Sequence, residues 1–330
     1  MPDHIRRHSD ALPAGSILHG CRIVRMLGAG SSGISYLAAN CRSGALHTLK
    51  EYFPNNGLRT ADGRITAKGP AERKSFRQGL KDFFREAELL RRLSHPNIVG
   101  ISGVFKADGH ACFMMPYLRG ITFHQWIKAH PNPNETELSA LFATLLDALG
   151  YLHSQKLLHG DLKPENILIT ENRRPVLIDF GAARRIGSRK HPTAEQAFTP
   201  AFAPIEQYLP DGRLLPASDL YGAGACLYQA LTRQLPPEAP ERTVGRDLHP
   251  VLAGSSYQAQ YSPAFLAAVD CALSVRAEDR FQSAEAMRQA LLGRTAPPYS
   301  RYGSDNRAAR RFRLTAVLQM LGKPFDKTAA

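Results

Sequence analysis

The chain has 330 residues, of which 43% are hydrophobic and 22% charged. This composition is ordinary for a globular protein, and it argues against wholesale disorder, a collagen-like repeat or a bundle of membrane spans. The formal net charge of +13 would suit a nucleic-acid or other anionic partner, but residues 294–330 carry eight Lys and Arg against two Asp, so nearly half of the excess lies at one end of the chain.

Residues 1–15 are polar, contain Pro and Gly and show no periodicity, so we expect a loose leader. They lack the apolar stretch of a signal peptide, and no stretch of the chain approaches the length of a transmembrane helix. The five cysteines are widely spaced and form no Cys-x-x-Cys pair, which predicts reduced thiols. We therefore expect a cytoplasmic protein without a transmembrane segment.

The next hundred residues favour a small antiparallel sheet with one helix. Short alternating runs bounded by Gly and Asn predict strands, which lie at 21–27, 34–40, 46–53, 97–105 and 110–118. Between them, residues 54–72 are rich in turn formers and interrupt the strand pattern. Residues 76–93 place apolar side chains at mostly helical spacing and precede a His-Pro-Asn stop, so they predict one amphipathic helix.

After Gly120 the pattern changes to longer helices. Helical periodicity is found at residues 137–155, 220–232, 263–273 and 283–292. Two segments between the first two of these helices, 156–169 and 175–184, combine short apolar strands with charged residues, as loops that carry chemistry often do. Residues 294–306 read as a linker, and 308–322 as a short, basic and partly amphipathic helix.

Gly28, Gly30 and Gly33 form the pattern Gly-x-Gly-x-x-Gly, which is a weak signal by itself. A dinucleotide-binding fold needs a helix directly after it, whereas residues 34–40 alternate as a strand does. The glycines therefore predict a hairpin turn whose backbone N–H groups can approach phosphate oxygens. An ordinary glycine hairpin is the alternative.

Charged residues farther along supply the remaining chemistry of phosphate transfer. Lys50 lies on a predicted strand, where it can neutralise phosphates, and Glu86 on the predicted helix is a suitable partner for it. In-line phosphoryl transfer needs an aspartate to accept a hydroxyl proton, oxygen ligands for Mg²⁺ and a cation beside the γ-phosphate. The segments His-Gly-Asp-Leu-Lys-Pro-Glu-Asn and Asp-Phe-Gly supply these groups in order as Asp161, Lys163, Asn166 and Asp179.

On these motifs the sequence resembles the protein kinase family. Within it, the chain is most similar to bacterial serine/threonine kinases with a Lys-Glu-Tyr-Phe-Pro strand and an Ala-Pro-x-Glu-Gln segment, and the resemblance covers about residues 17–292. It implies a bilobal α+β kinase domain over residues 16–293. A β-rich N-lobe would span residues 16–115, a hinge 116–120 and a mainly helical C-lobe 121–293.

The resemblance also implies a role for each site residue. The catalytic set would be the Lys50–Glu86 ion pair, Asp161 as base, Lys163 at the phosphate, and Thr199. ATP would be bound by Gly28, Ala29, Gly30, Ser31, Ser32, Gly33, Lys50, Met115 as gatekeeper, Pro116 and Leu118. Asn166 and Asp179 would hold Mg²⁺ or Mn²⁺. Glu88 competes with Glu86 as partner of Lys50. The family places this glutamate ten residues before the proline, and counting back from Pro96 favours Glu86. Structural roles would fall to His159, to Asp219 and to the pair Glu206 and Arg280.

Several positions depart from the family pattern. Gly160 replaces the arginine that usually precedes the catalytic aspartate and binds an activation-loop phosphate, so we expect activity that is independent of such a phosphate. Ser188 and Thr193 remain possible acceptors. The other departures are Ser32, Ser35, Pro116 and Phe198, which bear on ATP affinity and regulation.

The expected function is a serine/threonine protein kinase that uses ATP, acts on protein substrates and can autophosphorylate. The alternative is a pseudokinase or ATP-binding scaffold, which would lack one of the phosphate-handling residues. We expect no nucleic-acid partner, because the basic tail offers few aromatic side chains for stacking bases. The predicted helix at 308–322 could dock on a partner or an anionic surface, or remain solvated.

Overall fold

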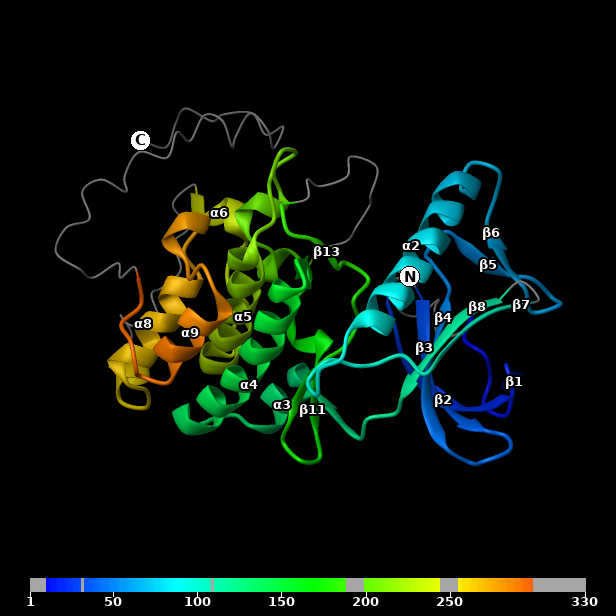
Figure 1. The fold of residues 1–330 in the computed structure, drawn as a ribbon, viewed down its shortest axis with the longest axis horizontal. Coiled ribbons are helices and arrows are strands. Elements are labelled where there is room, and N and C mark those ends of the chain that lie inside the picture. The colour runs from blue at the N-terminus through cyan, green and yellow to red at the C-terminus, as the bar shows by residue number, and fades with distance from the viewer. Residues whose placement is uncertain (1–9, 31–32, 108–109, 188–198, 244–254, 299–330) are drawn as a thin grey trace. The chain divides into compact units, whose positions relative to one another are not determined.

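The computed structural model describes residues 10–298, apart from 31–32, 108–109, 188–198 and 244–254 (Figure 1). The chain forms two compact units, the first ending at Gly120 and the second beginning at Ile121. In the described parts of both units, no helix is long and apolar enough to cross a membrane.

The first unit is built on a six-stranded antiparallel sheet with the order β1-β2-β3-β4-β8-β7. Its strands are β1 (Ile17–Leu18), β2 (Cys21–Ala29), β3 (Gly33–Asn40), β4 (Leu46–Tyr52), β7 (Gly103–Ala107) and β8 (His110–Pro116). Buried and exposed side chains alternate at the start of β2, whereas β3 and β4 each bury several consecutive residues. Ile23, Ile34 and Leu49 from these three strands lie in one apolar cluster. The strand predicted from residue 97 was wrong for residues 97–102, since β7 begins only at Gly103.

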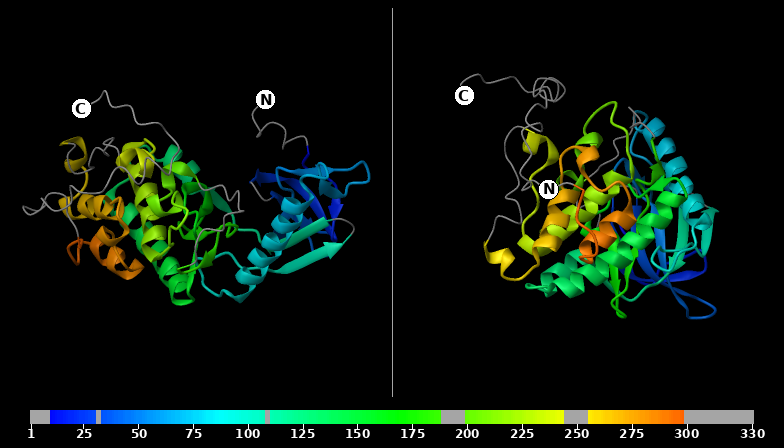
Figure 2. Two further views of the ribbon diagram at one scale, coloured as in Figure 1. Left: turned by 90° about the horizontal axis from the view of Figure 1, so that it is seen from above. Right: turned by 60° about the vertical axis from the view of Figure 1, so that its left-hand side comes forward.

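Helix α2 (Arg73–Arg92) is the predicted amphipathic helix, and Figures 1 and 2 show it along one face of the sheet. Phe83, Ala87 and Leu90 form its buried stripe. Arg91 and Arg92 in the last turn have the sign of charge that the negative end of the helix dipole favours. The helix ends before Leu93, whose backbone is extended, ahead of the His-Pro-Asn segment.

A short hairpin lies in the segment expected to contain only turns. Strands β5 (Gly57–Arg59) and β6 (Ile65–Ala67) pair with each other, and the Gly63 N–H donates to the Thr60 carbonyl at 2.8 Å to close the turn. Strands of three residues are too short to show an alternating pattern, so the sequence predicts only turns here.

The hairpin and the beginning of the chain meet at a buried carboxylate. Glu51 is fully buried; it accepts hydrogen bonds from Arg59 at 2.7 Å and from the Tyr36 hydroxyl at 3.2 Å, and His110 Nδ1 lies 2.8 Å from it. Arg59 also donates to the Asp10 carbonyl at 3.0 Å, and Tyr36 accepts from the Leu12 N–H at 3.1 Å. Residues 10–15 of the expected loose leader are therefore held against the sheet.

The second unit is mainly helical. Its helices are α3 (Phe123–Ala129), α4 (Glu135–Ser154), α5 (Pro216–Thr232), α6 (Ala239–Thr243), α7 (Ser255–Gln258), α8 (Pro263–Ala272) and α9 (Ala284–Leu291). Helix α5 is buried along nearly its whole length and packs against α4, α8 and α9 (Figures 1 and 2). Helix α3 was not predicted, because seven residues show little periodicity; a capping box between Thr122 and Gln125 begins it.

One short strand precedes α3, and four more lie between α4 and α5. They are β9 (Gly120–Thr122), β10 (Leu157–Leu158), β11 (Ile167–Thr170), β12 (Pro175–Leu177) and β13 (Arg184–Arg185). Strands β11 and β12 pair antiparallel. This pairing fixes the end of the polar segment before β11 and the start of the polar segment after β12. The predicted helix at 308–322 lies outside the described residues and stays a prediction.

Candidate active site

The glycine-rich segment joins β2 to β3 as a hairpin. Gly28 pairs with Ser35 and Ala29 with Ile34, and the Gly30 N–H donates to the Gly33 carbonyl at 2.8 Å. A Cβ atom at Gly33 would lie 2.1 Å from the Glu51 carbonyl oxygen, so only glycine lets β3 approach β4 here. Ser31 and Ser32 lie outside the described residues.

Lys50 lies on β4 and forms a buried ion pair with Glu86 of α2. Its Nζ is 2.8 Å from Glu86 Oε1, and the two side chains are only 9% and 3% exposed. Glu88, the competing candidate, is on the surface, where it pairs with Arg91 and Arg92. The structure thus brings Lys50 together with Glu86 and leaves Glu88 out of the site.

Aromatic contacts hold α2 in the position that this ion pair requires. The Phe83 ring of α2 packs between Tyr52 and Phe113, with centroid distances of 5.5 and 4.8 Å. The Tyr52 hydroxyl donates to the Phe76 carbonyl at 2.7 Å, and it can approach α2 because Gly79 has no Cβ. The carboxylate of Glu86 is therefore positioned by packing as well as by charge.

The three residues expected at the adenine lie at the end of β8 and directly after it. Met115 is buried and faces Thr48 across the strands, whereas Pro116 is exposed and Leu118 half-buried. They belong to the first unit, as do the glycine-rich segment and the Lys50–Glu86 pair.

In the second unit, three of the expected catalytic residues meet around one carboxylate. Lys163 Nζ lies 2.6 Å from Asp161 Oδ2 and donates to the Thr199 hydroxyl at 2.9 Å. The Thr199 hydroxyl in turn donates to Asp161 Oδ1 at 3.4 Å. A carboxylate held between an ammonium and a hydroxyl keeps a fixed direction, as a proton acceptor must.

Asn166 and Asp179 follow the same loop. The Asn166 amide nitrogen donates to the Asp161 carbonyl at 2.8 Å, and the Asn166 carbonyl accepts from the Ile178 N–H at 2.9 Å, one residue before Asp179. Asp179 is exposed and has a left-handed backbone, with φ of 63°. These contacts connect both candidate metal ligands to the backbone around Asp161.

The backbone before Asp161 is fixed from α5. The buried Asp219 carboxylate accepts hydrogen bonds from the N–H groups of His159 at 3.0 Å and Gly160 at 2.9 Å, and from His153 Nε2 at 2.9 Å. Burial alone would raise the pKa of Asp219, but these donors hold it below its ordinary value. His159 is fully buried with its ring 4.9 Å from that of Phe180, and burial lowers its pKa, so it packs as a neutral imidazole.

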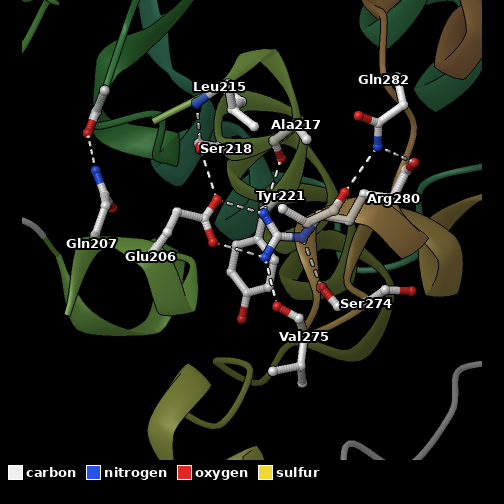
Figure 3. A network of polar contacts seen from close by, with 12 residues as sticks. Glu206, Gln207, Leu215, Ala217, Ser218, Tyr221, Ser274, Val275, Arg280 and Gln282 are labelled. Atoms are coloured by element: carbon white, nitrogen blue, oxygen red, sulfur yellow. Dashed lines mark hydrogen bonds and ion pairs between the residues drawn. The ribbon is translucent and has the colours of Figure 1, made fainter. Parts of the chain in front are cut away.

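The neighbouring side chains of Glu206 and Gln207 point in different directions (Figure 3). Glu206 forms a buried ion pair with Arg280 at 2.7 Å, as expected, and Ser218 donates to the same carboxylate at 2.7 Å. Gln207 instead donates its side-chain amide to the Gly160 carbonyl at 2.7 Å. Gln207 is the last residue of the Ala-Pro-x-Glu-Gln segment, but no role was expected for it.

Comparison with known proteins assigns a family to this arrangement. Residues 21–292 match the family described as protein kinase domain. The chain belongs to the protein kinase family. The kinase domain accounts for most of the chain, and both units contribute to the matched region.

Relatives of the kinase domain include bacterial serine/threonine kinases. It is 28% identical to serine/threonine-protein kinase D of Synechocystis sp., over 83% of this chain and 52% of that protein. It is 30% identical to serine/threonine-protein kinase PknA of Nostoc sp., over 63% of this chain and 38% of that protein. The chain thus spans about half of these relatives' length or less.

A solved structure described as the apo form of PpkA-294 is similar to the kinase domain with a TM-score of 0.75 and 31% identity. The alignment covers 86% of this chain and 99% of that one. The predicted kinase fold, with a β-rich and a mainly helical part, is confirmed by this likeness and by the family match.

The kinase family in general uses ATP together with a divalent metal ion, and the donor set here fits such an ion. No cluster of three or more His, Cys, Asp or Glu side chains that could hold a metal exists among the described residues. Asn166 and Asp179 offer an amide and a carboxylate oxygen, which are the hard ligands that Mg²⁺ prefers. Mg²⁺ commonly takes one or two protein carboxylates and completes its shell with phosphate oxygens and water, so two such residues suffice.

Proposed function

We propose that this kinase domain transfers the γ-phosphate of ATP to serine and threonine hydroxyls of protein substrates. The observation that carries the proposal is the contact of Asp161 with Lys163 and Thr199, which presents a carboxylate and an ammonium together. The pairing of Lys50 with Glu86 supports it, because a buried ammonium held by one carboxylate is ready to receive phosphate oxygens.

Each residue has one task in the proposed reaction. Asp161 accepts the proton of the attacking hydroxyl, and Lys163 offsets negative charge on the transferred group. Lys50, oriented by Glu86, binds the α- and β-phosphates. Asn166 and Asp179 would hold Mg²⁺, which when bound neutralises phosphate charge.

The proposed ATP site in the first unit consists of the glycine-rich hairpin and the end of β8. Backbone N–H groups from Gly28 to Gly33 would face the phosphates, and Pro116 to Leu118 would face the adenine, with Met115 behind it. The approach of β3 to β4 at Gly33 supports this assignment, because it fixes one side of the hairpin against the strand of Lys50.

We further propose that activity does not require a phosphate on the activation loop. In place of the usual arginine the chain has Gly160, which offers no charge to such a phosphate. Lys163 and Asp161 already contact Thr199, which lies near the end of that loop. Phosphatase treatment, or Ser188→Ala with Thr193→Ala, should lower the rate less than about threefold, whereas Thr199→Ala should lower it more.

The proposal is tested by incubating the purified full chain with labelled ATP, Mg²⁺ and a generic protein substrate, followed by mapping of the phosphorylated residues. Lys50→Met, Asp161→Asn and Asp179→Ala should each lower the rate by about 100-fold or more, because each removes charge stabilisation or proton acceptance. Chelation with EDTA should abolish transfer, and adding back Mg²⁺ or Mn²⁺ will show which metal is preferred.

Wild-type protein that binds ATP but phosphorylates neither itself nor any substrate would contradict this proposal and favour the pseudokinase. Phosphate found on tyrosine alone would contradict the assignment to serine and threonine. Circular dichroism of each variant provides the control, since the spectra should match that of the wild type.

A further inference from the structure

Gly160 makes the backbone before the proposed base unusually free. Glycine has no side chain to restrict it, and here its φ is +79°, a left-handed value that other residues rarely adopt. A Cβ atom at this position would lie 2.5 Å from the Ala182 carbonyl oxygen. Glycine is thus required by the local geometry, and some other group must hold the two peptide planes that flank it.

Two buried side chains from later in the sequence hold these planes, one plane each. Asp219 accepts from the Gly160 N–H at 2.9 Å and so fixes the plane between His159 and Gly160. Gln207 donates to the Gly160 carbonyl at 2.7 Å and so fixes the plane between Gly160 and Asp161. Because a peptide unit is planar, fixing its oxygen also fixes its nitrogen, which belongs to Asp161.

Gln207 belongs to the segment that contains Thr199. The Phe202 N–H donates to the Thr199 carbonyl at 2.9 Å, and Tyr208, next to Gln207, donates its hydroxyl to the Pro200 carbonyl at 2.9 Å. These contacts close residues 199–208 on themselves. Gln207 is only 8% exposed, and it lines one small cavity with Asp161 and Asp219.

We propose that Gln207 is a positioning residue that joins the segment of residues 199–208 to the loop of residues 159–166 and fixes the direction of Asp161. This inference rests on the proposed function. Related kinases usually have an arginine at the position of Gly160. Here the neutral side-chain amide of Gln207 connects the two segments instead. Since the contact needs only an N–H donor, it requires no phosphate.

The test uses isosteric variants of the full chain. Gln207→Met keeps the volume and removes the donor, and should lower kcat by about 10- to 100-fold, as a displaced catalytic group does, with little change in KM for ATP. Gln289→Met is the matched control, because Gln289 donates its amide on the exposed surface of α9. It should leave kcat unchanged.

Gln207→Glu separates positioning from packing. The carboxyl group it introduces can donate to the Gly160 carbonyl only when protonated. The cavity that residue 207 lines also contains the carboxylates of Asp219 and Asp161, whose partners are His153 and Lys163. Burial beside these groups favours the neutral form. The ratio of variant to wild-type kcat should therefore rise as the pH is lowered from about 8 to about 6. A ratio that stays constant with pH and well below one would overturn the proposal.

A second readout does not depend on catalysis. Hydrogen exchange of peptides covering residues 158–166 should be faster in Gln207→Met than in the wild type and unchanged in Gln289→Met. Equal exchange together with wild-type kcat would overturn the positioning role. An inactive wild type would overturn only the proposed function, since the exchange experiment would still test the contact.

Discussion

Glu206 and Arg280 lie 74 residues apart in the sequence and form a two-pronged ion pair, with Nη1–Oε1 and Nη2–Oε2 distances of 2.7 and 3.0 Å. The Arg280 side chain is fully buried over the ring of Tyr221. It also donates to the carbonyls of Ser274 at 2.7 Å, Val275 at 2.7 Å and Ala217 at 3.2 Å, so every nitrogen of the guanidinium has a partner (Figure 3).

Arg280→Met should destabilise the protein by about 3–5 kcal/mol, because it leaves the Glu206 carboxylate buried without its cation. Urea unfolding followed by circular dichroism measures the change in free energy. Arg288→Met is the control, since Arg288 forms an exposed pair with Glu285 on α9, and its unfolding midpoint should stay close to the wild-type value. A loss no larger than that of the control would contradict this interpretation of the pair.

Glu86→Gln should lower kcat/KM for ATP by at least about tenfold, since the neutral amide no longer orients the Lys50 ammonium. Glu88→Gln makes the same change two residues farther along α2, on the exposed face where Glu88 pairs with Arg91 and Arg92. Initial rates at varied ATP concentration should therefore be unchanged in the second variant. Equal losses in both would show that the buried pair has no special role.

Gly160→Ala should cost more than an alanine placed in an equally left-handed but open position. Gly293 has φ of +66°, and no atom lies within 4 Å of the place that a Cβ would take, so Gly293→Ala carries only backbone strain of about 1–2 kcal/mol. At Gly160 the clash with the Ala182 carbonyl adds about 1–3 kcal/mol. Comparing the two variants by urea unfolding isolates the clash, and equal losses would rule it out.

Glu51→Gln should make the free energy of unfolding depend less on pH in the acid range. Burial would raise the pKa of Glu51, but hydrogen bonds from His110 and Arg59 hold it below the ordinary value of 4.5. Its stabilisation is therefore present above the unfolded-state pKa and disappears as the pH falls through the lower folded-state value. At neutral pH the variant should lose about 1.5–3 kcal/mol.

Thermal unfolding of wild type and Glu51→Gln between about pH 7 and pH 3 tests this prediction. The difference between the two should shrink as the pH falls below the ordinary range of a glutamate. A difference that is constant over the whole series would show that the carboxylate of Glu51 is not ionised in the folded protein.

Much of this fold could be predicted because its signals are local. Alternation in residues 34–40 and helical spacing in residues 76–93 each identify an element that the structure contains as β3 and α2. The protein kinase family, predicted from the order of Lys50, Asp161 and Asp179, is confirmed by the match over residues 21–292. The roles of the individual site residues stay predictions.

What could not be predicted depends on contacts between distant segments. Glu51 follows Lys50 on the same strand, yet nothing local indicates that Arg59 and His110 close over it. Gln207 belongs to the Ala-Pro-x-Glu-Gln segment, yet nothing local indicates that its amide reaches the Gly160 carbonyl. Strands β5 and β6 were missed for the different reason that three residues carry too little pattern.

The long sequence separation of Glu206 and Arg280 also bears on the order in which the chain can fold during synthesis. At roughly 5–20 residues per second, Arg280 leaves the ribosome about 4–15 s after Glu206. Throughout that interval the Glu206 carboxylate has no cation with which it can be buried. The second unit can therefore complete its folding only after Arg280 has been synthesised. Lys50 and Glu86 are only 36 residues apart, so the first unit completes its ion pair within a shorter stretch of nascent chain.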